Sequence, residues 1–291
     1  MKQYNKTRIA PTPSGFLHLG NVLSFVITAA LARKHGAKIL LRIDDIDQAR
    51  ANEAYIQDIF DTLNFLEIPW HEGPRNTEQF AGTYSQLHRI DTYQAALTTL
   101  ANKEQVFACT CSRKQILVNS VCGCISKKLP LTTPNTSWRL ITSPDAELTV
   151  KNCNGQITTE KLPLEMQNFV VKKKDGFPAY QLTSVIDDVF FGVDIIIRGE
   201  DLWPSTLAQQ QLALALGLQQ ITDAAFYHHR LILGFDGAKL SKSAGATSVR
   251  YLRQQGKTPA DIYTIIARML GINKTIPHWQ QLAEIAVFED I

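Results

Sequence analysis

The sequence lacks any apolar run of the roughly 20 residues that a helix needs to cross a bilayer. This absence excludes an ordinary transmembrane helix, and we expect no membrane partner. The first residues, MKQYNKTRIAPTPSG, also lack the apolar core of a secretory signal peptide. Internal repeats and low-complexity tracts are missing as well. We therefore expect a globular protein of the cytoplasm.

The chain also has little excess charge of either sign. The 291 residues carry a net charge of +3, and 20% of them are charged and 45% hydrophobic, which is ordinary for a soluble globular protein. A sequence pI of about 8.5 is compatible with an RNA partner but does not require one. The length suffices for a substantial core and favours two modules.

Cysteine is rare, yet four of the five cysteines fall in one short segment, CTCSRKQILVNSVCGC. In a cytosolic protein such a cluster favours a metal over disulfides. Two close pairs separated by a loop suit a closed, tetrahedral zinc site without a catalytic role. The expected ligands of one structural zinc ion are Cys109, Cys111, Cys122 and Cys124. The alternative is a set of reduced, partly buried thiols, and Cys153 is too distant in sequence to be favoured.

The order of the predicted elements indicates an α/β fold. Residues 7–10 and 38–43 are typical of strands, with a helical pattern between them and another over residues 50–66. This order makes a βαβ unit, the start of a parallel sheet. Later in the chain, strand patterns at residues 193–198 and 226–233 flank a helical one at 205–218.

The texture of the sequence predicts a Rossmann-type parallel sheet that is interrupted by an inserted subdomain. Residues 107–175 hold the cysteine cluster and short alternating segments, whereas α/β character returns after them. The tail from about residue 248 is typical of one or two helices. The expected parts are a first catalytic half (1–105), the inserted subdomain (106–178), a second catalytic half (179–247) and a helical C-terminal segment (248–291).

Two glycine-rich loops carry the candidate chemistry. In PTPSGFLHLGN, a loop leaves a strand and enters a helix, where backbone N–H groups and the helix dipole suit phosphate. His18 can donate to phosphate oxygens, and Gly20 lets the backbone approach a nucleotide. In GAKLSKSAGA, Lys239 and Lys242 are flexible cations suited to a leaving pyrophosphate. Taken singly, the first loop is equally a plain strand-to-helix turn and the second a solvated basic turn.

The two loops together resemble the HIGH and KMSKS motifs of class I aminoacyl-tRNA synthetases. Five segments, in order, resemble the glutamate-specific branch of that family: RIAPTPSGFLHLGN, LLRIDDID, GFPAYQLTSVIDD, IIIRGEDL and GAKLSKS. The resemblance covers residues 8 to 245. It implies that the substrates are L-glutamate, ATP with Mg²⁺, and a tRNA.

The resemblance also implies the residues of the site. The catalytic residues are His18, Gly20, Lys239 and Lys242, and the ATP-binding residues are His18, Gly20, Asn21 and Lys242. The glutamate-binding residues are Arg8, Ile9, Ala10, Pro11, Thr12, Asp44, Tyr180 and Arg198. Arginine forks suit the two carboxylates of glutamate, and an aspartate suits its ammonium.

Two positions depart from the pattern of the family. The family usually has Glu where this chain has Asp44 and Ser where it has Thr12. Aspartate is one methylene shorter, so it reaches the ammonium through water or shares that task with Asp45. The zinc pattern departs too, because the family often completes the site with Tyr and a later Cys.

The acceptor of the glutamyl group follows from a further resemblance. Only residues 246–291 follow the second motif. This short layout resembles that of the glutamyl-queuosine tRNA(Asp) synthetases, which are members of the family without an anticodon-binding domain. They attach glutamate to the queuosine base in the anticodon loop of tRNA(Asp). One alternative is a truncated enzyme that charges the 3′ end of tRNA(Glu) or tRNA(Gln). Others are a catalytically silent RNA-binding regulatory module and a nucleotidyltransferase acting on a small acid.

Overall fold

The structure is a computed structural model that describes residues 2–112, 115, 122–232 and 248–288. The chain forms two compact units. The first comprises residues 1–88, 193–202 and 225–291, and the second comprises residues 89–192 and 203–224. This division cuts the sequence at other places than the four predicted segments, which stay a prediction.

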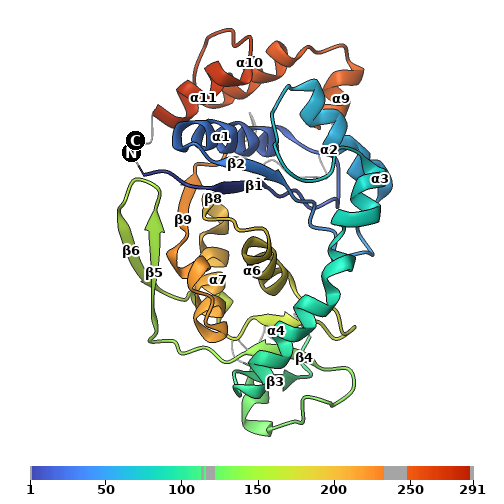
Figure 1. Ribbon diagram of the computed structural model, residues 1–291, viewed down its shortest axis with the longest axis vertical. Helices are drawn as coiled ribbons and strands as arrows, with labels where there is room; N and C mark the ends of the chain where they lie inside the picture. Colours follow the sequence, from blue (N-terminus) through green and yellow to red (C-terminus); the bar gives the residue numbers. More distant parts are fainter. Residues whose placement is uncertain (1, 113–114, 116–121, 233–247, 289–291) are drawn as a thin grey trace. The chain divides into compact units, whose positions relative to one another are not determined.

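Four short strands form the framework of the first unit (Figure 1). Strand β1 (Lys6–Ile9) pairs in parallel with β2 (Lys38–Leu41), and β8 (Ile195–Gly199) pairs in parallel with β9 (Ala225–His229). β8 lies beside β1, because the Asp194 N–H donates to the Lys6 carbonyl at 3.0 Å. All four strands run the same way, so their carboxyl ends meet at one edge.

Glycine shapes the segment that extends this framework beyond β2. Residues 71–72 lie beside β2, where the Leu41 N–H donates to the Glu72 carbonyl at 2.9 Å. Gly73 follows with φ +99°, and a Cβ there would lie 2.2 Å from the Leu41 carbonyl oxygen. Only glycine fits this close approach of two backbones.

Helices cover the strands of the first unit. Helix α1 (Leu19–His35) packs on β1, β2 and β8, and α11 (Trp279–Phe288) and α10 (Pro259–Met269) pack on α1. Other described helices of this unit are α2 (Glu53–Phe65), α3 (Thr77–Gln79), a short π-helix (Phe80–Tyr84), a 3₁₀ helix (Gln86–Arg89, whose last residue begins the second unit) and α9 (Val249–Gln254). The described C-terminal part thus holds three helices, so the prediction of one or two was wrong. Gly256 and Gly271 close α9 and α10, and their left-handed φ angles separate the helices.

The second unit combines helices with antiparallel strands. Strands β3 (Val106–Cys109), β4 (Ser137–Leu140) and β7 (Val170–Lys172) form one sheet, and β5 (Glu147–Asn152) and β6 (Ile157–Lys161) form a hairpin. Helix α6 (Tyr180–Phe190) packs against α4 (Ile90–Asn102), α7 (Trp203–Leu216) and α8 (Gln219–Asp223). Short 3₁₀ turns cover Gly123–Lys127 and Leu164–Met166, and a third, Glu200–Leu202, belongs to the first unit.

None of the helices that the structure describes is both long and apolar enough to cross a membrane.

Candidate active site

Two buried arginines lie at the edge where the strands of the first unit end. Arg8 is in β1 and 6% exposed, and Arg198 is in β8 and 4% exposed. The Arg8 guanidinium donates to the Ile197 carbonyl at 3.1 Å, which places it beside Arg198 on the neighbouring strand. The structure therefore brings these two predicted carboxylate-binding residues together.

The loops after β1 and β2 are joined by backbone hydrogen bonds. The Arg42 N–H donates to the Ile9 carbonyl at 2.9 Å, and the Asp44 N–H donates to the Pro11 carbonyl at 3.0 Å. These bonds continue the ladder past the strand ends, so Asp44 lies next to the loop that holds Thr12. The other predicted glutamate-binding residues of this region, at the end of β1 and in the loop after it, are thereby placed at the same edge as the arginines: Ile9, Ala10, Pro11 and Thr12.

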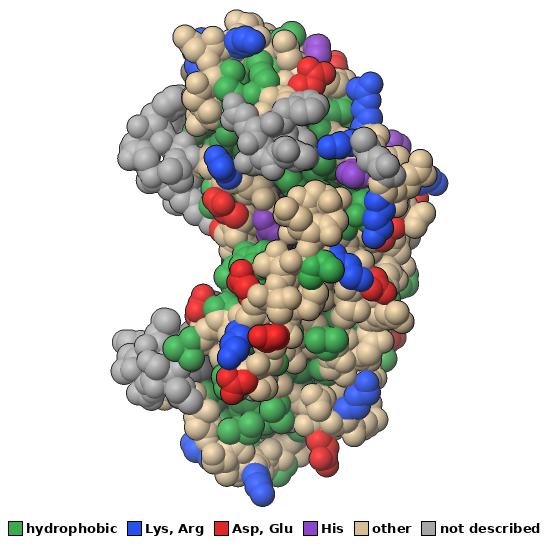
Figure 2. Space-filling model, turned by 90° about the vertical axis from the view of Figure 1, so that its left-hand side faces the viewer, with side chains coloured by type: hydrophobic (Ala, Val, Ile, Leu, Met, Phe, Trp, Pro, Cys, Tyr) green, Lys and Arg blue, Asp and Glu red, His purple; other side chains and the backbone are tan. Residues whose placement is uncertain are grey.

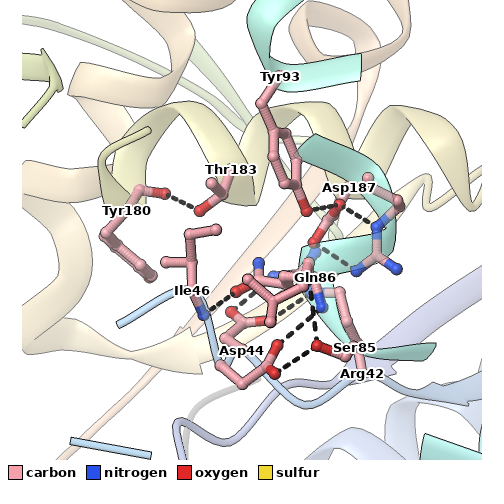
Figure 3. Close-up of polar contacts among 12 residues, drawn as sticks. Arg42, Asp44, Ile46, Ser85, Gln86, Tyr93, Tyr180, Thr183 and Asp187 are labelled. Atoms are coloured by element: carbon pink, nitrogen blue, oxygen red, sulfur yellow. Dashed lines mark hydrogen bonds and ion pairs between the residues drawn. The ribbon is translucent and has the colours of Figure 1, made fainter. Parts of the chain in front are cut away.

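Asp44 is not an isolated carboxylate. Arg42 forms a two-pronged pair with it, Nε to Oδ1 at 2.7 Å and Nη2 to Oδ2 at 3.0 Å, and both side chains are buried (Figure 3). Such a pair fixes the plane of the carboxylate. A ligand ammonium and the Arg42 guanidinium would therefore both interact with the negative charge of Asp44. Arg42 was not among the predicted site residues, although its place two residues before Asp44 puts both on one face of an extended segment.

Asp45 has a supporting task. Its carboxylate accepts the Ser85 hydroxyl at 2.6 Å and the Gln86 N–H at 2.7 Å. The Gln86 side chain in turn accepts the Ile46 N–H at 2.7 Å. These bonds tie the loop after β2 to residues 85–86. Ser85 and Gln86 are distant in sequence and belong to no motif, so sequence analysis could not find them.

His18 caps the helix that follows β1. Its Nδ1 accepts the Gly20 N–H at 3.1 Å, while the His18 N–H donates to the Asn21 side chain at 3.1 Å. Since Nδ1 is an acceptor, the proton of a neutral imidazole resides on Nε2, a donor suited to phosphate. A Cβ at position 20 would lie 3.1 Å from the ring, so glycine there lets the histidine fold over the backbone.

His228 adds an imidazole to the arginine pair. It lies opposite Arg198 in the parallel register of β8 and β9, and its ring stacks on Phe226. Burial, together with the charges of Arg198, His229 and Arg8, lowers the pKa of His228 to about 3. The ring is therefore neutral at physiological pH. No sequence motif marks this residue, because its neighbour is set by strand pairing.

The four predicted metal ligands converge in the second unit. Their sulfur atoms all lie within 4.8 Å of one another, and Cys153 is outside the group. The distances are 3.4 Å from Cys109 to Cys122, 3.8 Å from Cys111 to Cys122, and 3.5 Å from Cys111 to Cys124. A tetrahedral zinc ion with Zn–S bonds of about 2.3 Å would hold sulfurs about 3.8 Å apart. The cluster therefore fits that ion.

The thiols of this cluster have unequal acidities. Burial raises the pKa of Cys122 to about 12. Burial opposes ionisation of Cys124 as well, but hydrogen bonds from the Thr110 backbone and the neighbouring thiols lower its pKa to about 6. A metal ion requires thiolates, so it would compete with protons most strongly at Cys122.

Three predicted site residues are not part of the arrangement described above. Tyr180 is the first residue of α6 in the second unit, where it is 41% exposed and its carbonyl accepts the Thr183 hydroxyl (Figure 3). Lys239 and Lys242 lie outside the described residues. Their predicted roles stay predictions.

A parallel α/β sheet with a phosphate-suited helix start and buried arginines at its carboxyl edge is typical of nucleotide-binding catalytic domains. The chain belongs to a family of this class: the model of the class I tRNA synthetases (E and Q), catalytic domain, matches residues 5–119 and 144–284. The predicted α/β class I synthetase fold is thereby confirmed.

Individual relatives agree with this assignment. Glutamate–tRNA ligase 2 of Nitrosococcus oceani is 35% identical over 285 residues, which cover 91% of this chain and 59% of that protein. Glutamyl-Q tRNA(Asp) synthetase of Symbiobacterium thermophilum is 33% identical over 286 residues, which cover 91% of this chain and 86% of that protein. The chain thus spans a little over half the length of the glutamate–tRNA ligases that it matches.

Solved structures show the same fold. The glutamate–tRNA synthetase of Elizabethkingia anophelis matches with a TM-score of 0.75 at 22% identity, over 97% of this chain and 65% of that chain. The glutamate–tRNA ligase of Elizabethkingia meningosepticum in complex with its amino acid matches with a TM-score of 0.72 at 23% identity, over 96% and 64%.

Proposed function

We propose that this protein activates L-glutamate with ATP and transfers the glutamyl group to the queuosine base of tRNA(Asp). The observation that carries the first step is the pair of buried guanidinium groups, Arg8 and Arg198, at the strand edge that also holds Asp44. Two cations and an anion match the two carboxylates and the ammonium of glutamate. Burying a charged group costs free energy, and a ligand of opposite charge would offset that cost.

The proposed chemistry needs positioning and charge stabilisation. A glutamate α-carboxylate oxygen attacks the α-phosphorus of ATP, and the bond to pyrophosphate breaks. His18, with its proton on Nε2, donates to the phosphate oxygens, and the start of α1 stabilises their charge. The Gly20 N–H is held by His18, so glycine contributes through close packing. Lys239 and Lys242 are proposed to neutralise the pyrophosphate, which Mg²⁺ accompanies.

In the second step a hydroxyl of the acceptor attacks the acyl carbon of the adenylate. The new ester bond forms, the hydroxyl loses its proton, and AMP leaves. The proposed site of this reaction is the cytoplasm, where tRNA is found.

Amino-acid-dependent exchange of labelled pyrophosphate into ATP tests the first step. We expect exchange with glutamate, and none with glutamine or aspartate. The His18→Ala variant is the matched control, because it removes the phosphate donor and should abolish the signal. Exchange with another amino acid, or none with any, would overturn the assignment. The absence of exchange with any amino acid would favour the catalytically silent RNA-binding module.

The proposed acceptor rests on the relative named Glutamyl-Q tRNA(Asp) synthetase, of which the match covers 86%. The second candidate function is charging of the 3′ end of tRNA(Glu) or tRNA(Gln), which the 35% identical Glutamate–tRNA ligase 2 favours. An isolated anticodon stem-loop of tRNA(Asp) has no 3′ acceptor end. Glutamylation of the queuosine-containing stem-loop supports the first function; label on intact tRNA(Glu) alone supports the second.

We also propose that Cys109, Cys111, Cys122 and Cys124 hold one zinc ion. The support is the mutual distance of their sulfurs, which suits a closed tetrahedral site. When bound, zinc would fasten β3 to the turn at residues 123–127. The cluster would then be structural, with no step of the reaction passing through it.

A further inference from the structure

Asp58 is a buried carboxylate beneath the loop that leads to His18. It lies in α2 and is 2% exposed. One oxygen, Oδ2, accepts the Leu17 N–H at 3.2 Å, and the other, Oδ1, accepts Nη2 of Arg253 in α9 at 3.1 Å. One side chain thus joins α2, α9 and the residue directly before His18.

The same loop has a second set of contacts with α9. The Leu17 carbonyl accepts the Val249 N–H at 2.8 Å, and His18 forms an antiparallel bridge with Ser248. Both backbone groups of Leu17 are therefore fixed, its N–H by Asp58 and its carbonyl by α9.

Aromatic contacts continue this junction around Phe16. The Arg250 guanidinium lies over the Phe16 ring at 4.5 Å, and Tyr55 of α2 contacts the same ring edge-on at 4.8 Å. Residues 16–18 are thus held between α2 and α9. A shift of Asp58 or Arg253 would move the backbone on which His18 is mounted.

We propose that Asp58 is a positioning residue for adenylate formation, acting through the Leu17 N–H to hold His18 in place. This role rests on the proposed function. A carboxylate is suited to it, because it can accept from Leu17 and from Arg253 at once. An asparagine offers one oxygen and one amide group that is itself a donor.

The electrostatics of Asp58 show what its ionised form requires. Burial raises its pKa, the Leu17 N–H and the charges of Arg253 and Arg250 lower it, and Asp61 raises it, with a net upward shift. The charged form therefore exists at a free-energy cost, which hydrogen bonds to both partners offset. An ion pair with one buried partner is weak evidence for added stability, and a positioning role explains the burial of Asp58 better.

The test compares Asp58→Asn with Asp61→Asn in glutamate-dependent pyrophosphate exchange. Asp61 lies on the same helix, 3.9 Å from Arg253, and its carboxylate accepts a hydrogen bond from the Gln57 side chain, whereas Asp58 accepts the Leu17 N–H. Asp61→Asn is therefore a matched loss of charge. We expect Asp58→Asn to lower kcat roughly 10- to 100-fold per folded molecule, as small misplacements do. The KM for glutamate should change less than about twofold, since Arg8 and Arg198 are untouched. Asp61→Asn should retain wild-type kcat.

Two further readouts separate positioning from a merely structural role. Wild-type kcat should fall at acid pH as Asp58 becomes protonated, and this fall should occur at a higher pH than that at which an ordinary aspartate titrates. The pH profile of Asp58→Asn should lack this fall. If Asp58→Asn does not fold, Arg253→Gln decides. This variant removes the guanidinium that holds the Asp58 carboxylate under the Leu17 N–H, so it should lower kcat without changing the KM for glutamate.

The outcomes are distinct. Wild-type protein without glutamate-dependent exchange overturns the proposed function, and this role with it. An active wild type, together with normal kcat in folded Asp58→Asn or in Arg253→Gln, overturns the positioning role alone.

Discussion

His228 is the residue at which packing and charge conflict most clearly. It lies beside Arg198, and burial and the neighbouring cations bring its pKa to about 3, from about 6.5 in an unfolded chain. Between these values the unfolded chain binds more protons than the folded one. Stability contributed by the neutral ring is therefore complete above about pH 6.5 and is lost as the pH falls toward 3.

The first prediction concerns this histidine. The free energy of unfolding of the wild type should fall between about pH 7 and about pH 5. In His228→Gln this fall should be smaller, by on the order of 2 kcal/mol. Urea unfolding at the two pH values measures it. His88→Gln is the control, because it makes the same substitution at an exposed histidine. An equal dependence in wild type and His228→Gln would contradict the account.

The resemblance to the family indicated single residues but not their partners. Arg8, Asp44 and Arg198 were predicted from that resemblance, and the structure brings them to one edge. The fork from Arg42 to Asp44 and the approach of His228 to Arg198 depend on strand register. Register is set by long-range pairing, which local patterns do not contain.

Helix α6 is anchored by a buried ion pair within the second unit. Arg89 donates to Asp187 through Nε at 2.8 Å and Nη2 at 3.1 Å, and the Tyr93 hydroxyl donates to the same carboxylate at 2.7 Å (Figure 3). Asp187 is fully buried, and burial raises the pKa of Tyr93 far above its usual range. The triad fastens α4 to α6, the helix that begins at Tyr180.

Asp187→Asn should therefore cost about 3–5 kcal/mol of unfolding free energy, because it leaves the Arg89 charge buried without its counterion. Urea unfolding measures this loss. Asp145→Asn is the matched control: its pair with Lys161 is exposed and should contribute no more than about 1 kcal/mol. Equal losses in the two variants would refute the anchoring role.

The cysteine cluster supplies a prediction for the strand β3 and the turn after it. Metal analysis of desalted protein should find about one zinc per chain, and Cys124→Ser should lose it and unfold at lower temperature. Cys153→Ser should keep the zinc, because this buried cysteine lies outside the cluster. Protein without zinc, or zinc retained equally by both variants, would contradict the proposal.

Most elements were predictable, because hydrophobic periodicity reports them directly. The strands at 7–10, 38–43 and 193–198 and the helix at 205–218 correspond to β1, β2, β8 and α7 within a few residues. The sequence also has a helical pattern over residues 84–101. The α-helix there begins only at Ile90, since Ser85 and Gln86 turn to meet Asp45. Tertiary hydrogen bonds of this kind override local propensity.

For the whole molecule, charge distribution adds little to the identity of the acceptor. Among the described residues on the face in Figure 2, acidic and basic side chains are interspersed, in keeping with a net charge of +3. The two kinds of relative are also nearly equal in identity, 35% and 33%. The acceptor is therefore identified by measuring which RNA receives the glutamyl group.

The most direct measurement is the transfer of labelled glutamate, with ATP and Mg²⁺, to three RNAs in parallel. These are queuosine-containing tRNA(Asp), the same tRNA without queuosine, and tRNA(Glu). The proposed function predicts label on the queuosine-containing tRNA(Asp) alone. Label on tRNA(Glu) would contradict it and would make the protein an enzyme that charges the 3′ end.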